Sequence, residues 1–157
     1  MADFSDVFAQ VAQAVRKVKS DQALKKKLAE EALESVQRRT KLGRGVNKPE
    51  GPSNKLPTLK TKTVSTRKSL KRSGKLSSSA TPTKSNITRS GKTLGSMKSK
   101  IKSDGFDINL DKRGERVAKD LIAIDKDYTF MNLSKAEVKR LVKIIEQQIQ
   151  QFVGKIK

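Results

Sequence analysis

Two short stretches of this chain have residue types that could handle a nucleotide. Gly91-Lys92-Thr93 matches the end of a phosphate-binding loop, and Leu121 to Asp125 matches the apolar strand that carries a magnesium-binding carboxylate. The loop also needs a glycine at position 86, where the chain has Asn86, and a buried strand before it, which Thr81 to Ser85 cannot form. Alternating strands and helices are also absent. We therefore expect no nucleotide hydrolysis.

The aspartates could bind a metal ion and the serines could act as nucleophiles, but the sequence supports neither kind of site. Six aspartates in the last third of the chain match no cation-binding loop, and we interpret them as solvated turn and strand positions. The chain has no Cys and no His, which excludes disulfides, thiolate and imidazole metal ligands and His-dependent serine nucleophiles. We expect no catalytic residue, no metal and no cofactor, and we predict that the protein is not an enzyme.

Phosphate binding without catalysis has better support. Residues 43–103 contain 16 Lys or Arg and one acid, Glu50, whereas both flanks are nearly neutral. This Gly/Ser/Thr/Pro-rich block predicts contact with an anionic partner, either DNA phosphates or an acidic protein face; the alternative is a solvated linker. Aromatics are absent from the block, so bases would not be stacked, and flexible Lys-rich segments would contact the phosphates independently of sequence. The candidate contact residues are Lys60, Lys62, Arg67, Lys68, Lys71, Arg72, Lys75, Lys84, Arg89 and Lys92.

Helical periodicity marks residues 1–42. Apolar residues recur every three or four positions from Val7 to Val18, and again from Leu24 to Val36. Ser20-Asp21 lies between the two runs, so one bent helix and two separate helices are both compatible with the pattern. Gly43 and Gly45 end the helical region.

The basic block has weaker local signals. Three prolines between Pro49 and Pro57 predict a loop or an extended arm, and the alternation over Thr58 to Thr66 weakly favours a strand. Arg72-Ser-Gly-Lys75 recurs as Arg89-Ser-Gly-Lys92, which indicates a repeated turn. The large apolar residues of the block come singly, so it must pack on another part of the protein or stay mobile.

A hairpin and a helix are predicted after the block. Met97 to Ile101 and Phe106 to Leu110 flank Asp104-Gly105 as two strands around a tight turn. Lys112 to Gly114 is then interpreted as a turn, Arg116 to Ile124 as either a short helix or a buried strand, and Asp125 to Asp127 as its end.

Ser134-Lys-Ala-Glu137 forms a capping box at the start of a long amphipathic helix. The predicted packing or interface face of this helix comprises Val138, Leu141, Val142, Ile145, Ile149, Phe152 and Val153.

Together these elements predict one α+β domain over residues 1–157. It has an N-terminal helix or helix pair (1–42), a long basic loop or arm with weak strands (43–103), and a strand, a short helix and a long C-terminal amphipathic helix (104–157). The strands form a small antiparallel sheet. A secretion signal and an apolar run of eighteen residues are absent, so we expect a soluble protein of the reducing cytoplasm with no membrane contact. Trp is absent, with one Tyr and five Phe, so the core is thin and neighbouring subunits are expected to complete it.

Ile87 to Met97 and Tyr128 to Ser134 carry a resemblance to the tail-completion, or head-to-tail joining, proteins of tailed bacteriophages. The first stretch is similar to that family's apolar-Thr-Arg-Ser/Thr-Gly segment leading into a strand, and the second to its entry into the last helix. The order of the elements also fits, so the resemblance covers most of the chain.

The resemblance implies a structural protein of the virion neck, assembled in the host cytoplasm. Its α+β subunits would form a homo-oligomeric ring, commonly of six copies, between the head connector and the tail. That ring would contact adjacent neck and tail proteins, and viral DNA would pass through it. The alternative that charge alone allows is a small, non-sequence-specific DNA-binding protein of the nucleoid type.

Overall fold

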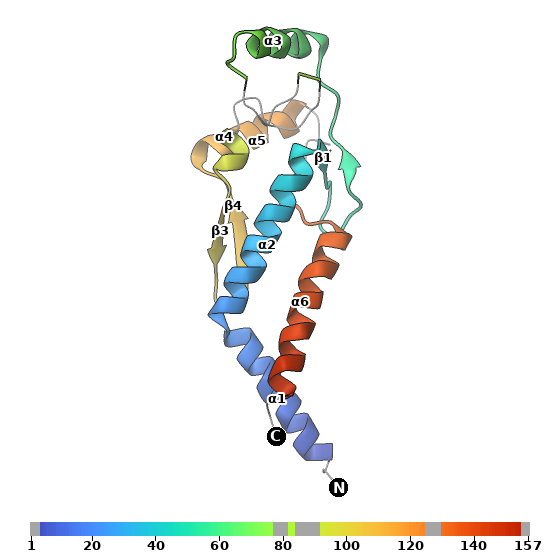
Figure 1. Ribbon diagram of the computed structural model, residues 1–157, viewed down its shortest axis with the longest axis vertical. Coiled ribbons are helices and arrows are strands. Elements are labelled where there is room, and N and C mark those ends of the chain that lie inside the picture. The colour runs from blue at the N-terminus through green and yellow to red at the C-terminus, as the bar shows by residue number, and fades with distance from the viewer. Residues whose placement is uncertain (1–3, 77–81, 84–91, 125–129, 155–157) are drawn as a thin grey trace.

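A computed structural model describes residues 4–76, 82–83, 92–124 and 130–154 of the chain. The protein is α+β, as expected, and its described parts form an elongated body (Figure 1). The elements in chain order are α1 (Phe4–Ser20), α2 (Gln22–Lys41), β1 (Arg44–Gly45), β2 (Asn54–Lys55), α3 (Thr61–Arg72), α4 (Lys92–Gly95), β3 (Lys98–Ile101), β4 (Phe106–Asn109), α5 (Lys112–Ile124) and α6 (Lys135–Val153).

Helix α2 is the centre of the arrangement. It packs against α6 on one side and against the β3–β4 hairpin on another, while α1 also packs against α6. Helix α3 lies at one end of the long axis, and the start of α1 and the end of α6 lie toward the other end (Figure 1).

The N-terminal helical region is two helices, which decides between the alternatives left open by its sequence. Asp21 has an extended backbone and is the N-cap of α2, where its Oδ1 accepts a hydrogen bond from the Leu24 amide at 3.0 Å. At the other end of α2, Gly43 takes a φ of 75° just after the C-cap residue Leu42. A left-handed residue at this position ends helices, and glycine adopts it without a steric cost.

The predicted hairpin is confirmed. β3 and β4 pair in antiparallel register, with Lys98 opposite Asn109 and Ile101 opposite Phe106. Lys102 and Asp107 form an ion pair at 2.5 Å on its exposed side, which raises the pKa of Lys102, first through the hydrogen bond and then through the charge of Asp107. Because solvent screens this pair, we assign the stability of the hairpin to its packing on α2.

Two small hydrophobic clusters form the core. The first joins α2 to α6 through Leu24, Leu28, Ala32 and Leu141, and the second joins α2 to the later segments through Val36, Leu94, Met97 and Phe130. Leu94 and Met97 belong to the basic block and are buried, as are Val46 and Leu56. Leu94 and Met97 therefore pack against residues outside the block, Val36 and Phe130, as their isolation in the sequence requires.

The strand-like interpretation of Thr58 to Thr66 is wrong, because α3 begins at Thr61 and the basic arm contains a regular helix. The turn proposed at Lys112 to Gly114 is also wrong. These residues are the first turn of α5, whose start Asp111 stabilises by accepting a hydrogen bond from the Gly114 amide at 2.6 Å. Arg116 to Ile124 is helical, while Asp125 to Asp127 lie outside the described residues.

The proline-containing segment is mostly irregular, as expected, although it includes a minimal antiparallel pair of strands. Arg44 pairs with Lys55, and Gly45 with Asn54. Beyond the second strand, the Leu56 amide donates to the Gly43 carbonyl at 2.8 Å before Pro57, which has no amide hydrogen to donate.

Helix α6 begins with the predicted capping box. The Ser134 side chain accepts from the Glu137 amide, and Glu137 Oε2 accepts from the Ser134 amide at 2.7 Å. Along the helix, Leu141 is buried and Ile145 packs beside it, while Ile149, Phe152 and Val153 are half-buried. Val138 is half-buried over the β4 edge, and Val142 is 43% exposed, so the predicted face only partly coincides with the buried one.

Replacing Ser134 by Ala is expected to lower the free energy of unfolding by about 1 kcal/mol, because the Glu137 amide loses its acceptor at the helix start. Urea denaturation of the two proteins measures this. The Ser134→Thr variant keeps a capping hydroxyl and should recover most of the loss. Equal midpoints for the alanine variant and the unmodified protein would show that the cap contributes nothing.

Candidate nucleic-acid interface

The exposed surface of α3 consists of two kinds of side chain. Its eight exposed residues are all basic or hydroxyl-bearing, namely Thr61, Lys62, Ser65, Thr66, Lys68, Ser69, Lys71 and Arg72. The inner side of the helix carries its two large apolar residues, Val64 and Leu70, both half-buried. The surface thus presents ammonium, guanidinium and hydroxyl donors without an apolar patch.

The C-terminal end of α3 is held by a specific backbone arrangement. Gly74 takes a φ of 68°, and its amide bonds to the Lys71 carbonyl, while the Lys75 amide bonds to the Leu70 carbonyl at 2.9 Å. These two bonds form a Schellman motif, which fixes the position of Lys75 just beyond the helix. The first Arg-Ser-Gly-Lys copy is therefore a helix end, and most of the second copy lies outside the described residues.

Four exposed cations lie on the second half of α3 and just beyond its end, and we call them the α3 stripe: Lys68, Lys71, Arg72 and Lys75. Lys68, Lys71 and Arg72 have the three- and four-residue spacing of one helical face, and Lys75 follows the helix end. Arg67 points elsewhere, is 5% exposed, and lines a hollow of about 240 Å³ with Lys62, Thr63 and Thr66. Its burial removes Arg67 from the outer surface that the sequence predicts for it.

The other candidate contact residues lie in different parts of the molecule. Lys60 is the exposed N-cap residue of α3, and Lys62 is exposed in its first turn. Lys92 begins α4, which packs against α5, so it belongs to a different part of the molecule. Lys84 and Arg89 lie outside the described residues.

The charge distribution around α3 is unfavourable for an isolated helix. Lys60 and Lys62 are at the N-terminal end, where the helix dipole disfavours cations, and the first turn has no acid. Two exposed like charges, Lys68 and Arg72, also lie at four-residue spacing on the helix surface. From 51 to 103 the sequence has no Asp or Glu, so this stretch supplies no counter-charge of its own.

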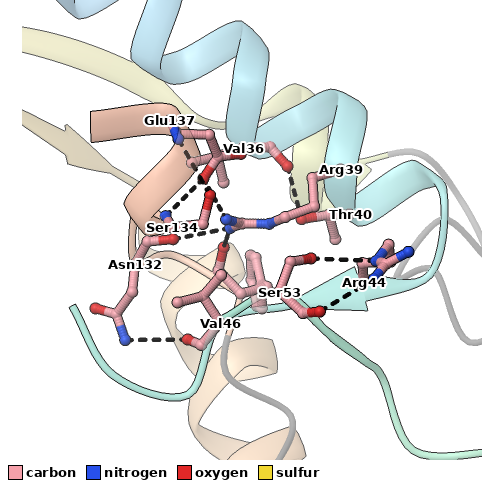
Figure 2. Close-up of polar contacts among 10 residues, drawn as sticks. Val36, Arg39, Thr40, Arg44, Val46, Ser53, Asn132, Ser134 and Glu137 are labelled. Carbon is pink, nitrogen blue, oxygen red and sulfur yellow. Dashed lines mark hydrogen bonds and ion pairs between the residues drawn. The ribbon is translucent and has the colours of Figure 1, made fainter. Parts of the chain in front are cut away.

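The strongest polar site is buried and was missed by the sequence reasoning. Arg39 of α2 is 7% exposed and donates from Nη1 to Glu137 Oε2 of α6 at 2.6 Å. Its Nη2 donates to the backbone carbonyls of Phe130 at 2.7 Å and Asn132 at 2.8 Å (Figure 2). One guanidinium thereby joins α2, the 130–132 segment and the start of α6.

Further hydrogen bonds extend this buried group. Asn132 Nδ2 donates to the Val46 carbonyl at 3.1 Å, which ties the proline-containing segment to it (Figure 2). Burial lowers the pKa of Arg39, and the charge of Glu137 opposes that shift. Because a guanidinium remains protonated in proteins, we interpret the pair as a structural clamp.

The described residues form neither a metal-binding cluster nor a membrane-spanning helix. Within these ranges no three carboxylates gather closely enough to hold a metal ion. Each helix that the structure describes is too short or too polar to cross a lipid bilayer.

Comparison with known proteins gives no relative: no protein-family model, no curated protein and no solved structure matches the chain.

Proposed function

We propose that the protein is a structural subunit of a phage neck, which assembles into a ring between the head connector and the tail. The observation that carries the proposal is the convergence of its two phage-like segments. Leu94 and Met97 from the first lie in the same buried cluster as Phe130 from the second, with Met131 and Leu133 packed against it. Segments about 35 residues apart thus form one structural unit, which supports treating both resemblances as parts of a single fold.

The exposed surface offers places where neighbouring subunits can pack. Val11 and Val15 of α1 are 42% and 47% exposed, and Val142 of α6 is also exposed, on two helices that contact each other. We assign these exposed apolar side chains to contact with a neighbouring chain. A ring would bury them and would complete the thin core.

Native mass spectrometry of the purified protein tests the assembly. We expect a closed homo-oligomer, with six copies favoured by the resemblance. A protein that stays monomeric with and without its neck and tail neighbours would contradict the proposal.

Virion assembly tests the biological role. A phage lacking the gene should accumulate DNA-containing heads without joined tails, and an epitope on the protein should map to the neck by immuno-electron microscopy. Normal virions from the deletion phage would contradict the neck role.

The charge of α3 favours one other candidate, a small DNA-binding protein of the nucleoid type. A nucleoid protein should bind duplex DNA tightly as a free subunit with a steep salt dependence, whereas a ring component should bind weakly before assembly. Gel-shift titrations over a range of salt concentrations, with the oligomeric state measured in the same buffers, distinguish the two.

A further inference from the structure

We infer that the α3 stripe (Lys68, Lys71, Arg72 and Lys75) binds the sugar-phosphate backbone of duplex DNA, without reading its sequence. This deepens the proposed neck role and rests on it for the biological setting, in which the duplex is the viral genome passing through the ring. The binding itself is a property of the chain and can be measured separately.

The chemistry of the exposed side chains favours phosphate over a protein partner. Each of the eight exposed residues of α3 carries an amine, a guanidinium or a hydroxyl. Lys, Arg, Ser and Thr are the side chains that contact DNA phosphates, whereas the centres of protein interfaces are depleted in Lys and depend on aromatic and apolar anchors. Helix α3 exposes no such anchor.

The geometry of the stripe suits a continuous polyanion. Lys68 to Arg72 span about 6 Å at the rise of a helix, which corresponds to about two nucleotides of one DNA strand. The Schellman bond from the Lys75 amide to the Leu70 carbonyl keeps the fourth cation next to the end of the helix. A series of phosphates can therefore be contacted along one edge.

Charge repulsion gives an independent reason for an anionic partner. The stripe places like charges at three- and four-residue spacing, each pair costing about 0.2–0.5 kcal/mol in a helix. Three Thr and one Val among its twelve residues also lower the helix propensity of α3. A bound phosphate backbone would neutralise the repulsion, so α3 should become more stable when DNA binds.

The absence of aromatics selects duplex over single-stranded DNA. Residues 9–105 include no Phe, Tyr or Trp, so α3 and its neighbours in the sequence offer no ring on which unpaired bases could stack. Proteins that bind single strands gain much of their affinity from such stacking. The duplex, with its higher density of phosphates, is then the better ligand.

Fluorescence anisotropy with a labelled duplex tests the inference over a range of salt concentrations. We compare the full-length protein with the variant Lys68→Gln/Lys71→Gln/Arg72→Gln/Lys75→Gln. Removing four phosphate contacts should reduce the slope of log affinity against log salt by about 3 to 4. Relative to equal affinities at about 1 M salt, this weakens binding at about 0.1 M salt about a thousandfold or more. Two duplexes of unrelated sequence should behave alike, and a single strand should bind more weakly.

A matched variant controls for net charge. Lys135, Lys139, Arg140 and Lys143 are four exposed cations of α6, and their replacement by Gln removes the same charge from a different surface. This variant should change the slope by less than about 1. Equal losses in the two variants would overturn the inference, because the affinity would then follow total charge.

Hydrogen exchange gives a second readout that needs no mutation. Saturating duplex should slow exchange of the α3 amides more than that of the α6 amides. Unchanged exchange in α3 with DNA bound would overturn the inference. Native mass spectra of the same samples keep the two proposals separate: a protein that forms rings but has an inert α3 stripe refutes this inference alone, whereas a DNA-binding monomer refutes the neck role alone.

Discussion

Replacing Arg39 by Met is expected to lower the free energy of unfolding by about 3–5 kcal/mol. The change leaves the Glu137 carboxylate buried without its cation, and it removes the donors that the Phe130 and Asn132 carbonyls use. Three segments that are distant in the sequence would then lose their shared contact. Because the free energy of unfolding of small domains is only about 5–15 kcal/mol, this loss would remove a large part of it.

Urea denaturation followed by circular dichroism measures the effect, and the neighbouring residue supplies the control. Arg38 is exposed on the same turn of α2, so Arg38→Met should change the stability by no more than about 0.5 kcal/mol. If Arg39→Met cost less than about 1 kcal/mol, Arg39 would not be the clamp that its contacts indicate.

A variant of Glu137, the ion-pair partner of Arg39, separates the stability contributed by the ion pair from that contributed by the capping box. Glu137→Gln keeps a side-chain oxygen that can accept from the Ser134 amide, since Gln also serves in capping boxes. It removes the negative charge beside Arg39, so a large loss of stability in this variant would assign the effect to the ion pair. A combined Arg39→Met/Glu137→Gln variant should lose less than the sum of the single changes, because neither charge is then left alone.

Replacing Phe130 by Ala is expected to cost about 3–5 kcal/mol, by opening a cavity in the second cluster. Phe130 is 1% exposed and is packed among Val36, Leu94 and Met97. The aromatic ring is the largest side chain in this cluster, and the small core offers few residues that could fill its place.

Thermal and urea unfolding both report this loss, with Ile122→Ala as the comparison. Ile122 of α5 is 42% exposed, so its truncation should change the stability by about 0.5 kcal/mol or less. A Phe130→Ala protein with the stability of the Ile122→Ala protein would contradict the placement of Phe130 at the centre of the cluster.

The elements with strong local signals were predictable from the sequence. Ser134 and Glu137 specify a helix start through their own hydrogen bonds, and Asp104-Gly105 specifies a hairpin turn between alternating strands. Neither signal depends on the rest of the chain. The break at Asp21 remained ambiguous because an N-cap residue and a polar residue inside a helix have the same sequence signature.

Helix α3 could not be recognised because its inner face is only partly apolar. Val64, Arg67 and Leu70 follow one another at three-residue spacing on this face, and the middle residue of the three is charged. The short alternation of Thr with Lys around Thr61 and Thr63 then favoured a strand. With a charged residue at the centre of the inner face, the helical period is hidden.

Arg39 was missed because a basic residue in a pair of arginines suggests a solvated surface. A signal was nevertheless present: Arg39 follows Val36 by three residues, on the continuation of the stripe formed by Leu28, Ala32 and Val36. A charge at a stripe position implies a buried partner. Its identity, Glu137, depends on how α6 lies beside α2, which no local pattern reveals.

The two ends of the long axis carry different elements, so the orientation of each subunit can be determined. The first turn of α1 and the last turn of α6 lie at the pole opposite α3 (Figure 1). A heavy-metal label on the first turn of α1 or the last turn of α6 would therefore mark that end and leave α3 unobstructed. In an averaged image, such a label would tell which way every copy points.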